Sequence, residues 1–187
     1  MNFASRSRLA MAASRAYIGC RNPMETHVTI KPGDKLPEVT FRVVTQDQPA
    51  PRSTSDIFGG KKVVLFAVPG AFTPTCHRNH LPGYLEHYDA FKAKGVDTVA
   101  VTAVNDVFVM DAWAKATGGL GKIEFLADGS GDFAKATGME LDRVAAGLGV
   151  RSQRYAMLVE DGVVKVLNLD DGGKLDISGA DTILQAL

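Results

Sequence analysis

Cys76 stands in the segment VPGAFTPTCHRNHLPGY (residues 68–84), directly after the apolar run KKVVLFAVPG. Thr73 is of a residue type that favours the N-cap of a helix, and Pro74 favours the first helical position. Cys76 would then be the third helical residue, where backbone N–H groups lack intrahelical partners and the helix dipole is positive. Both effects favour a thiolate, the nucleophilic form of cysteine. The spacing therefore predicts a reactive thiol at Cys76.

A reactive thiolate needs partners if it is to catalyse a reaction. An ordinary thiol is about 3% ionised at neutral pH, so complete ionisation gains only about 30-fold in rate, or about 2 kcal/mol. Larger accelerations come from fixed donors aimed at the transition state. The Thr73 hydroxyl, one helical turn before Cys76, is one candidate, and Arg154 or Arg151 is the second. Such a set would polarise an O–O bond while the thiolate attacks it.

The turn that precedes the predicted helix offers further groups. Pro69 is expected to shape this turn and shield the thiolate, and free N–H groups near Gly70 and the cysteine could hold a substrate oxygen. Arg154 opens the apolar segment RYAMLVE, which we expect to form a strand beside the apolar run and so approach this pocket. Arg78 and His80 are expected to be solvated residues on the helix.

The elements that must position these residues alternate along the chain. The expected strands lie within residues 31–44, 61–70, 96–104 and 123–128, followed by a hairpin of RYAMLVE and VVKVLNL joined by Asp161-Gly162. The first expected helix follows Cys76, is bent or interrupted at Pro82 and Gly83, and ends at Gly95. The second begins with Asn105 and Asp106. The last two are SGDFAKATGM and SGADTILQAL, the latter with Ser178 as its cap. Residues 47–53 are expected to form a loop, and Phe108, Met110 and Trp113 have the spacing of core residues. This order predicts a thioredoxin-like α/β fold, a central mixed β-sheet flanked by helices on both faces.

The composition fits one globular domain. Of the 187 residues, 45% are apolar and 22% are charged, and 21 basic side chains balance 21 acidic ones. A protein that holds nucleic acid by neutralising phosphates usually has a basic excess, so we expect no nucleic-acid partner. No run approaches the roughly 18 apolar residues of a membrane-spanning helix, so we expect no membrane partner either.

Residues 1–23 differ from the rest of the chain. They hold four arginines, three serines and no acidic residue, which is the composition of a transit peptide. We expect a cleavable, disordered leader directed to the mitochondrial matrix, with a plastid or the cytoplasm as alternatives and a cloning-derived tail as the other interpretation. Residues 27–187 would form the folded domain. Cleavage near residues 21–24 would remove Cys20 and leave Cys76 alone, which fits a reducing compartment.

Two neighbouring motifs, PGAFTPTC and HLPGY, resemble the active-site signature of the peroxiredoxins, in the variant of the atypical type-five/type-II subgroup. The segments KAKGVD, VNDVFVMDAW, FLADGSGDFAKATG and RYAMLVEDGVVKVLN extend the resemblance over residues 27–187. It implies a thiol peroxidase that reduces hydrogen peroxide and alkyl hydroperoxides through a sulfenic acid on Cys76, in antioxidant defence and redox homeostasis. Thr73 and Arg154 would orient the thiolate and the peroxide, and Pro69 would line the pocket. The resemblance also implies a homodimer through the face that carries the active site, and no metal or flavin.

The resemblance departs from part of the family at the resolving cysteine. Relatives that resolve the sulfenic acid internally carry a second cysteine in the strand before VND or near the last helix, where this chain has Val101 and Asp176. We therefore expect a one-cysteine cycle, in which an external thiol attacks the oxidised Cys76. Glutathione with glutaredoxin, or thioredoxin directly, could supply that thiol. A disulfide between Cys20 and Cys76 in the uncleaved protein is an alternative.

Other interpretations of Cys76 stay open at this point. It could be an inert buried thiol, since free cysteine is among the most buried residue types. Together with His77 and His80 it could suggest a zinc or copper site, although a closed structural site needs four ligands and the sequence has no second cluster. A disulfide exchanger is disfavoured because Thr73 stands where Cys-x-x-Cys would need a cysteine. The rival function is a redox-sensing module that passes oxidation from Cys76 to partner proteins.

Overall fold

The structure, a computed structural model, describes residues 28–171 and 174–187. The predicted leader (residues 1–23) and Cys20 lie outside the described residues. The strands are β1 (Thr40–Thr45), β2 (Gln48–Ser53), β3 (Lys62–Ala67), β4 (Thr98–Ala103), β5 (Ile123–Ala127), β6 (Glu140–Arg143), β7 (Gly149–Ser152), β8 (Tyr155–Glu160) and β9 (Val163–Leu169). The helices are α1 (Thr54–Phe58), the π-helix η1 (Cys76–His80), α2 (Leu81–Glu86), α3 (Tyr88–Ala93), α4 (Val107–Thr117), α5 (Asp132–Ala136), the 3₁₀ turn η2 (Val144–Ala146) and α6 (Ala180–Gln185).

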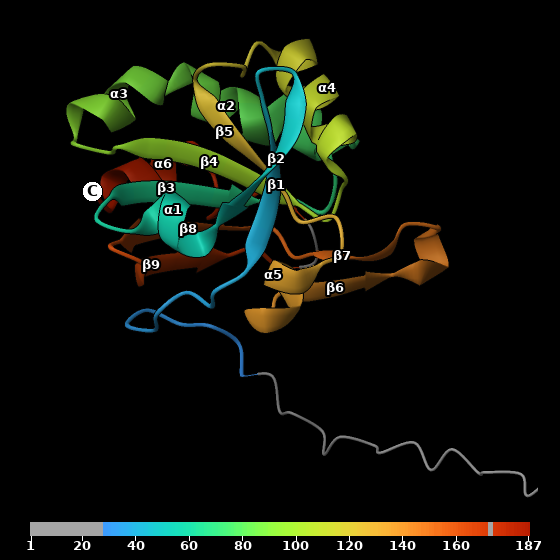
Figure 1. Cartoon of the computed structure of the whole chain (residues 1–187). Helices are drawn as coiled ribbons and strands as arrows, with labels where there is room; N and C mark the ends of the chain where they lie inside the picture. Colours follow the sequence, from blue (N-terminus) through green and yellow to red (C-terminus); the bar gives the residue numbers. More distant parts are fainter. Residues whose placement is uncertain (1–27, 172–173) are drawn as a thin grey trace, which may run out of the picture.

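A seven-stranded mixed sheet forms the centre of the molecule, in the order β2-β1-β5-β4-β3-β8-β9 (Figure 1). Strands β3, β4 and β5 are parallel, and β8 joins β3 antiparallel. The short pair β6 and β7 forms a separate two-stranded sheet that projects from the body. The central strand β3 is buried on both faces, as expected for the continuous apolar run KVVLFA in the parallel part of a sheet.

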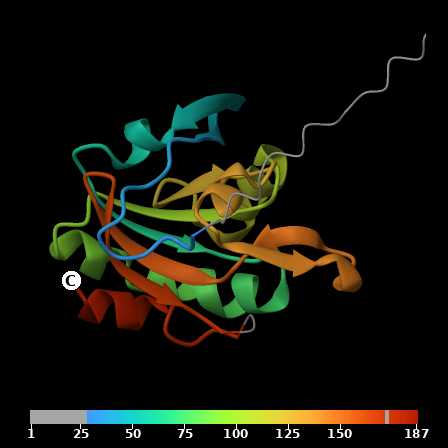
Figure 2. The ribbon, with the colours of Figure 1, turned by 90° about the horizontal axis from the view of Figure 1, so that it is seen from below.

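Alternate residues of β3 belong to two apolar cores, one on each face of the sheet. Val64 and Phe66 pack with the side chains of α2, α3, α4 and α6. Val63 and Leu65 pack on the other face, which α1 and α5 cover together with the chain before β1. Figures 1 and 2 show these two layers from the side and from below. The predicted thioredoxin-like α/β architecture is confirmed.

The predicted loop over residues 47–53 is wrong, because Gln48–Ser53 forms strand β2. This strand pairs with β1 along its whole length, and the turn between them places Gln46 and Asp47 at φ 51° and 61°. Two positive φ values suit the two-residue turn of a β-hairpin. Pro49 and Pro51 cannot donate hydrogen bonds, but β2 is an edge strand and tolerates them.

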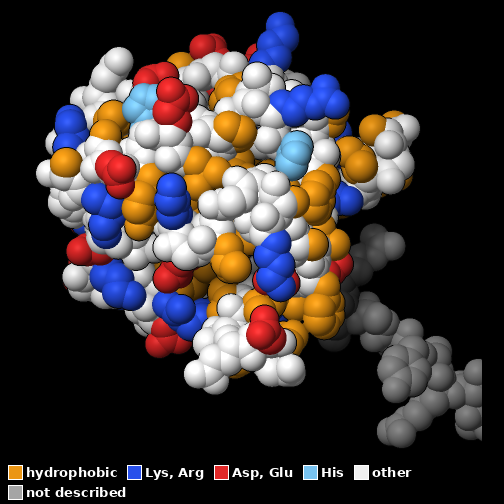
Figure 3. All heavy atoms as spheres, turned by 90° about the horizontal axis from the view of Figure 1, so that it is seen from above, with side chains coloured by type: hydrophobic (Ala, Val, Ile, Leu, Met, Phe, Trp, Pro, Cys, Tyr) orange, Lys and Arg blue, Asp and Glu red, His pale blue; other side chains and the backbone are white. Residues whose placement is uncertain are grey.

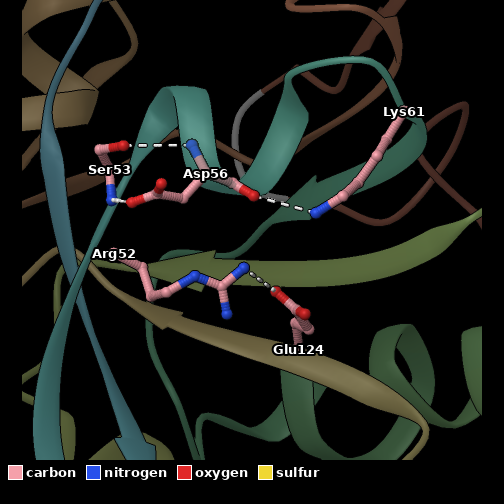
Figure 4. Close-up of polar contacts among 5 residues, drawn as sticks. All are labelled: Arg52, Ser53, Asp56, Lys61 and Glu124. Atoms are coloured by element: carbon pink, nitrogen blue, oxygen red, sulfur yellow. Dashed lines mark hydrogen bonds and ion pairs between the residues drawn. The ribbon is translucent and has the colours of Figure 1, made fainter.

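Polar contacts fix the edge of the sheet where β2 leads into α1 (Figure 4). The Ser53 hydroxyl accepts a hydrogen bond from Asp56 N at 3.1 Å, and the Asp56 carboxylate accepts one from Ser53 N at 2.9 Å. This reciprocal pair is a capping box that starts the helix. Lys61 Nζ donates to the Asp56 carbonyl at 2.9 Å, and Arg52 reaches across to Glu124 of β5 at 3.9 Å.

Of the two alternatives predicted at Pro82 and Gly83, a bend or an interruption of the helix after Cys76, the interruption is wrong, because η1 continues directly into α2. Within η1 the N–H of Leu81 bonds to the carbonyl of Cys76, five residues earlier. This wider turn shifts the hydrogen-bond register just before Pro82, so the proline is accommodated within α2. The break falls instead at His87, between α2 and α3.

One hairpin was not predicted, and two further predictions are wrong. The hairpin of β6 and β7 was not expected, because its two four-residue strands carry little apolar alternation. Ser178 does not cap α6, whose N-cap is Gly179. Met110 and Trp113 are core residues as predicted, but Phe108 is 69% exposed.

The surface carries mixed charge. On the face seen in Figure 3, acidic and basic side chains lie among apolar ones and neither sign dominates. In the described part of the chain, no helix has the length and apolar character needed to cross a membrane.

Candidate active site

Cys76 is the first residue of η1, and its side chain is fully buried. Arg154 immediately precedes β8, whose residue Tyr155 pairs with Ala67 at the end of β3. The chain leaves β3 towards the helix that carries Cys76, so this register brings the two side chains together. Arg154 Nη2 donates to Cys76 Sγ at 3.4 Å, and Arg154 is only 3% exposed. A buried cation therefore faces the sulfur from the residue before β8, the strand that was predicted to lie beside β3.

Arg151, the alternative cation, has other partners. Its Nη1 donates to the Val104 carbonyl at 2.9 Å, and its Nε donates to the Leu148 carbonyl at 2.6 Å. A Cβ atom at Gly70 would lie 3.5 Å from Arg151 Nη1, so the guanidinium borders the turn that precedes the cysteine. Arg151 thus holds loop carbonyls together beside the pocket, while Arg154 contacts the sulfur.

The turn before the cysteine is held by its own hydrogen bonds. The Thr73 hydroxyl donates to the Gly70 carbonyl at 2.9 Å, and Ala71 N donates to Asn105 Oδ1 at 2.9 Å. The N–H of Ala71 is therefore already used, although a free N–H near Gly70 was expected. A Cβ atom at Gly70 would come within 3.2 Å of Thr73 Cγ2, so glycine keeps this turn compact. Pro69, half-buried, completes it.

Thr73 occupies the predicted N-cap position, directly before the first helical residue, but its hydroxyl hydrogen-bonds to the turn rather than to the helix. Its carbonyl accepts the N–H of His77 at 2.9 Å and so begins the helical bonding, and Pro74 is the first helical residue as expected. The hydroxyl proton is directed to the Gly70 carbonyl. A hydroxyl has two acceptor lone pairs besides its proton, so Thr73 can still accept a hydrogen bond from a substrate O–H.

Phe72 is a feature that the sequence did not indicate. Its φ is 61°, in the left-handed region that a bulky residue rarely adopts. Its ring is 48% exposed and stacks on the imidazole of His77, with ring centroids 5.6 Å apart. Such backbone strain persists only where surrounding structure enforces it, and it concentrates at functional sites.

His80 is buried, and the expectation that it is a solvated residue is wrong. It is 1% exposed, its Nδ1 lies 3.1 Å from Arg154 Nη1, and its Nε2 lies 3.0 Å from the Ser178 carbonyl. Burial lowers the pKa of His80 to about 4, and the neighbouring charge of Arg154 acts in the same direction. Imidazole is therefore neutral at physiological pH. Its spacing of four from Cys76, which places both side chains on one side of a helix, was the available signal. Arg78, in contrast, is exposed as predicted.

Ser178 and Asp170 form a buried support behind His80. The Ser178 hydroxyl and N–H donate to the Asp170 carboxylate at 2.5 and 2.9 Å. Asp170 N in turn donates to the Arg154 carbonyl at 3.0 Å, and the Tyr84 hydroxyl donates to the Ser178 carbonyl at 2.7 Å. The segment before α6 is thus connected to the backbone of Arg154 through Asp170, and to the side chain of Arg154 through Ser178 and His80.

A metal site at Cys76, His77 and His80 does not form. His77 Nδ1 accepts a hydrogen bond from Trp113 Nε1 at 3.0 Å, and His80 faces Arg154. Across residues 28–171 and 174–187, no group of three or more cysteine, histidine or acidic side chains could hold a metal ion. Cys76 is a free thiol there.

Comparisons with known proteins agree with this geometry. Residues 31–184 match the Redoxin family. The chain is 42% identical over 186 residues to Peroxiredoxin-2E, chloroplastic, of Arabidopsis thaliana, an alignment that covers 97% of this chain and 78% of the relative. It is 47% identical over 156 residues to Peroxiredoxin-2C of Oryza sativa subsp. japonica, covering 83% and 96%. The crystal structure of reduced Prx3 in complex with H₂O₂ from Vibrio vulnificus has a TM-score of 0.81 and 48% identity, covering 84% of this chain and 99% of that one.

These likenesses extend over nearly the whole described domain and include the strands that bring Arg154 to the buried thiol. The fold, the family and the reaction type that the sequence resemblance implied are therefore all confirmed. The chain belongs to the peroxiredoxin family, in its atypical type-five/type-II group, and is a thiol peroxidase that uses a hydroperoxide and a thiol reductant.

Proposed function

We propose that Cys76 is the peroxidatic nucleophile of this thiol peroxidase. The observation that carries the proposal is the 3.4 Å contact between Arg154 Nη2 and Cys76 Sγ, made where both groups are buried. The thiolate donates an electron pair to one peroxide oxygen, and the O–O bond breaks with its electrons on the other oxygen. That oxygen takes a proton and leaves as water or an alcohol, while Cys76 becomes a sulfenic acid. Hydrogen peroxide and small alkyl hydroperoxides are the proposed substrates.

The roles of the other residues follow from their hydrogen-bonding capacity. Arg154 stabilises the negative charge that develops in the transition state, where a fixed donor contributes most. Thr73 accepts the O–H of the incoming peroxide, because its own proton is directed to the Gly70 carbonyl. Pro69 and Gly70 line the substrate pocket. We infer no metal or organic cofactor in this step.

A one-cysteine cycle is part of the proposal. The positions at which relatives carry a resolving cysteine hold Val101, buried in β4, and Asp176, exposed before α6. The oxidised Cys76 would therefore be attacked by an external thiol, from glutathione with glutaredoxin or from thioredoxin. Release of the sulfenic oxygen as water gives a mixed disulfide, which a second thiol reduces.

We also propose a homodimer that covers the face around the active site. Phe72, Phe108 and Leu148 are exposed, although each is large and apolar. Phe72 belongs to the turn before Cys76, and the Leu148 carbonyl accepts a hydrogen bond from Arg151. Phe108 follows Asn105, which holds that turn, by three residues in the chain. Exposed apolar side chains gathered in one region are typical of an interaction surface.

The proposed leader, residues 1–23, lies outside the described residues, so its role rests on composition. One matched relative is named Peroxiredoxin-2E, chloroplastic, and its alignment covers 97% of this chain. That likeness supports the plastid alternative over the mitochondrial matrix. We propose residues 27–187 as the folded enzyme domain.

Single-turnover oxidation tests the function. The full chain carrying Cys20→Ser, fully reduced, is mixed with hydrogen peroxide beside the same chain that also carries Cys76→Ser. We expect rapid loss of one thiol per chain in the first protein and none in the second. A rate no faster than that of free cysteine would overturn the proposal. Sustained turnover with glutathione and glutaredoxin, or with thioredoxin, separates the enzyme from a redox relay that passes oxidation to partner proteins.

A further inference from the structure

We propose that His80 is a positioning residue for the peroxidase reaction, and that its Nδ1 holds the Arg154 guanidinium in the orientation that faces Cys76. The two terminal nitrogens of Arg154 diverge. Nη2 is 3.4 Å from Cys76 Sγ, and Nη1 is 3.1 Å from His80 Nδ1. The inference rests on the proposed roles of Cys76 and Arg154.

The direction of each hydrogen bond follows from the chemistry of the groups. A guanidinium only donates, so His80 Nδ1 must accept and carries no proton. The imidazole proton is then on Nε2, which donates to the Ser178 carbonyl at 3.0 Å. Ser178 thus selects the tautomer that lets His80 accept from Arg154.

The contacts close into a ring. The Arg154 side chain donates to His80, His80 donates to Ser178, Ser178 donates to Asp170, and Asp170 N donates to the Arg154 carbonyl. Every member is buried. An arginine side chain has several freely rotating bonds, and fixing them costs conformational entropy. We infer that the ring supplies this restraint before a peroxide arrives.

The groups packed on His80 favour the neutral imidazole. Phe66 of β3 and Tyr84 of α2 pack their rings at centroid distances of 5.1 and 5.5 Å. The facing charges are Arg154, at the start of β8, and Asp170, which lies behind Ser178. A second proton on the imidazole would point an N–H at the guanidinium and lose the acceptor. The lowered pKa of His80, about 4, agrees with this arrangement.

Two substitutions separate the two nitrogens of the imidazole. His80→Asn places an amide group at about the distance of Nδ1 from the backbone, so its oxygen can accept from Arg154. His80→Gln places its amide further out, near Nε2, where it can still donate to Ser178 but cannot accept from Arg154 in the same way. The two variants are matched in polarity and chemistry.

The test measures single-turnover oxidation by hydrogen peroxide in the full chain with Cys20→Ser. Each rate is divided by the thiolate fraction, which is read from ultraviolet absorbance. We expect His80→Gln to lose about 10-fold to 100-fold in rate per thiolate, as displaced catalytic groups do. We expect His80→Asn to stay within about threefold of the parent. Thermal unfolding checks that both variants are folded.

The outcomes are distinguishable. If the parent does not consume peroxide faster than free cysteine, the proposed function itself fails. If the parent reacts and folded His80→Gln matches it, or if both variants lose the same rate, only the positioning role is overturned. Should either variant unfold, the nitrogen chemical shifts of the His80 imidazole in the parent give the second measurement. A proton on Nε2 with Nδ1 unprotonated supports the inference, and a proton on Nδ1 overturns it, because a protonated Nδ1 cannot accept from Arg154.

Discussion

Arg154 Nη2 lies 3.4 Å from Cys76 Sγ, although the two residues are 78 positions apart in the chain. The pairing of Ala67 with Tyr155 sets this distance, because it aligns the end of β3 with the start of β8. A one-residue slip in this register would turn the Arg154 side chain to the opposite face of the sheet. The site is therefore assembled by the pairing of two adjacent strands of the sheet, β3 and β8.

Arg154→Met should slow peroxide reduction by about 100-fold or more per thiolate, because a donor aimed at the transition state is lost. Single-turnover kinetics with thiolate titration measures this. Arg151→Met is the matched control, since Arg151 lies beside the pocket but bonds to loop carbonyls. We expect a loss of less than about fivefold for the control. If Arg154→Met changes only the thiolate fraction, the donor role of Arg154 is wrong.

Thr73→Val should reduce the rate about 10-fold, because the loss of one hydrogen bond to the transition state slows a reaction by about this factor. Valine keeps the branched shape of threonine but has no oxygen to accept the peroxide O–H. Thr73→Ser restores the hydroxyl and should recover most of the rate. Equal rates for valine and serine in single-turnover assays would remove the hydroxyl from the mechanism.

The sequence predicted the elements that local pattern determines. The apolar run of β3 and the hairpin of β8 and β9 are visible as continuous or alternating apolar residues, and they locate Cys76 and Arg154. His80 was misjudged because its partner Ser178 is 98 positions away, and no local pattern indicates that contact. Strand β2 was missed because its prolines suggest a loop, while the edge position that permits them depends on the whole sheet.

Trp113 should report on the state of Cys76. It is the one tryptophan of the sequence, is fully buried, and donates to His77, the residue after the cysteine. Because Cys76 is buried, a mixed disulfide with glutathione requires the first turn of η1 to open, which breaks this hydrogen bond. We expect the fluorescence emission to shift to longer wavelength on glutathionylation, and no shift in Cys76→Ser. An unchanged spectrum, with the mixed disulfide verified by mass spectrometry, would contradict this.

Phe108→Asp should weaken the proposed dimer about 10-fold to 100-fold, because a buried aromatic side chain contributes about 1.5–3 kcal/mol to an apolar interface. Sedimentation velocity over a range of concentrations measures the change. Leu120→Asp is the control, because Leu120 is also exposed but follows the far end of α4. A monomeric parent, or equal dissociation constants for the two variants, would show that the dimer does not use this face.

His80 should make the folded protein less stable as pH falls from about 6.5 to about 4. Burial lowers the pKa of His80 to about 4, below its ordinary value of 6.5, so the unfolded chain binds a proton in this window that the folded chain does not. This contribution to stability is complete above about pH 6.5 and is lost towards about pH 4. It amounts to about 2 kcal/mol between about pH 7.5 and pH 4.5.

Denaturant unfolding at several pH values checks this against His80→Asn, whose side chain does not titrate. The free energy of unfolding of the parent should fall by about 2 kcal/mol more than that of the variant over the same interval. Other groups titrate alike in both proteins, so the difference between the two curves isolates His80. Parallel curves would mean that the imidazole binds its proton as readily in the folded protein as in the unfolded chain. The burial and the Arg154 charge around His80 would then not favour its neutral form, contrary to the lowered pKa.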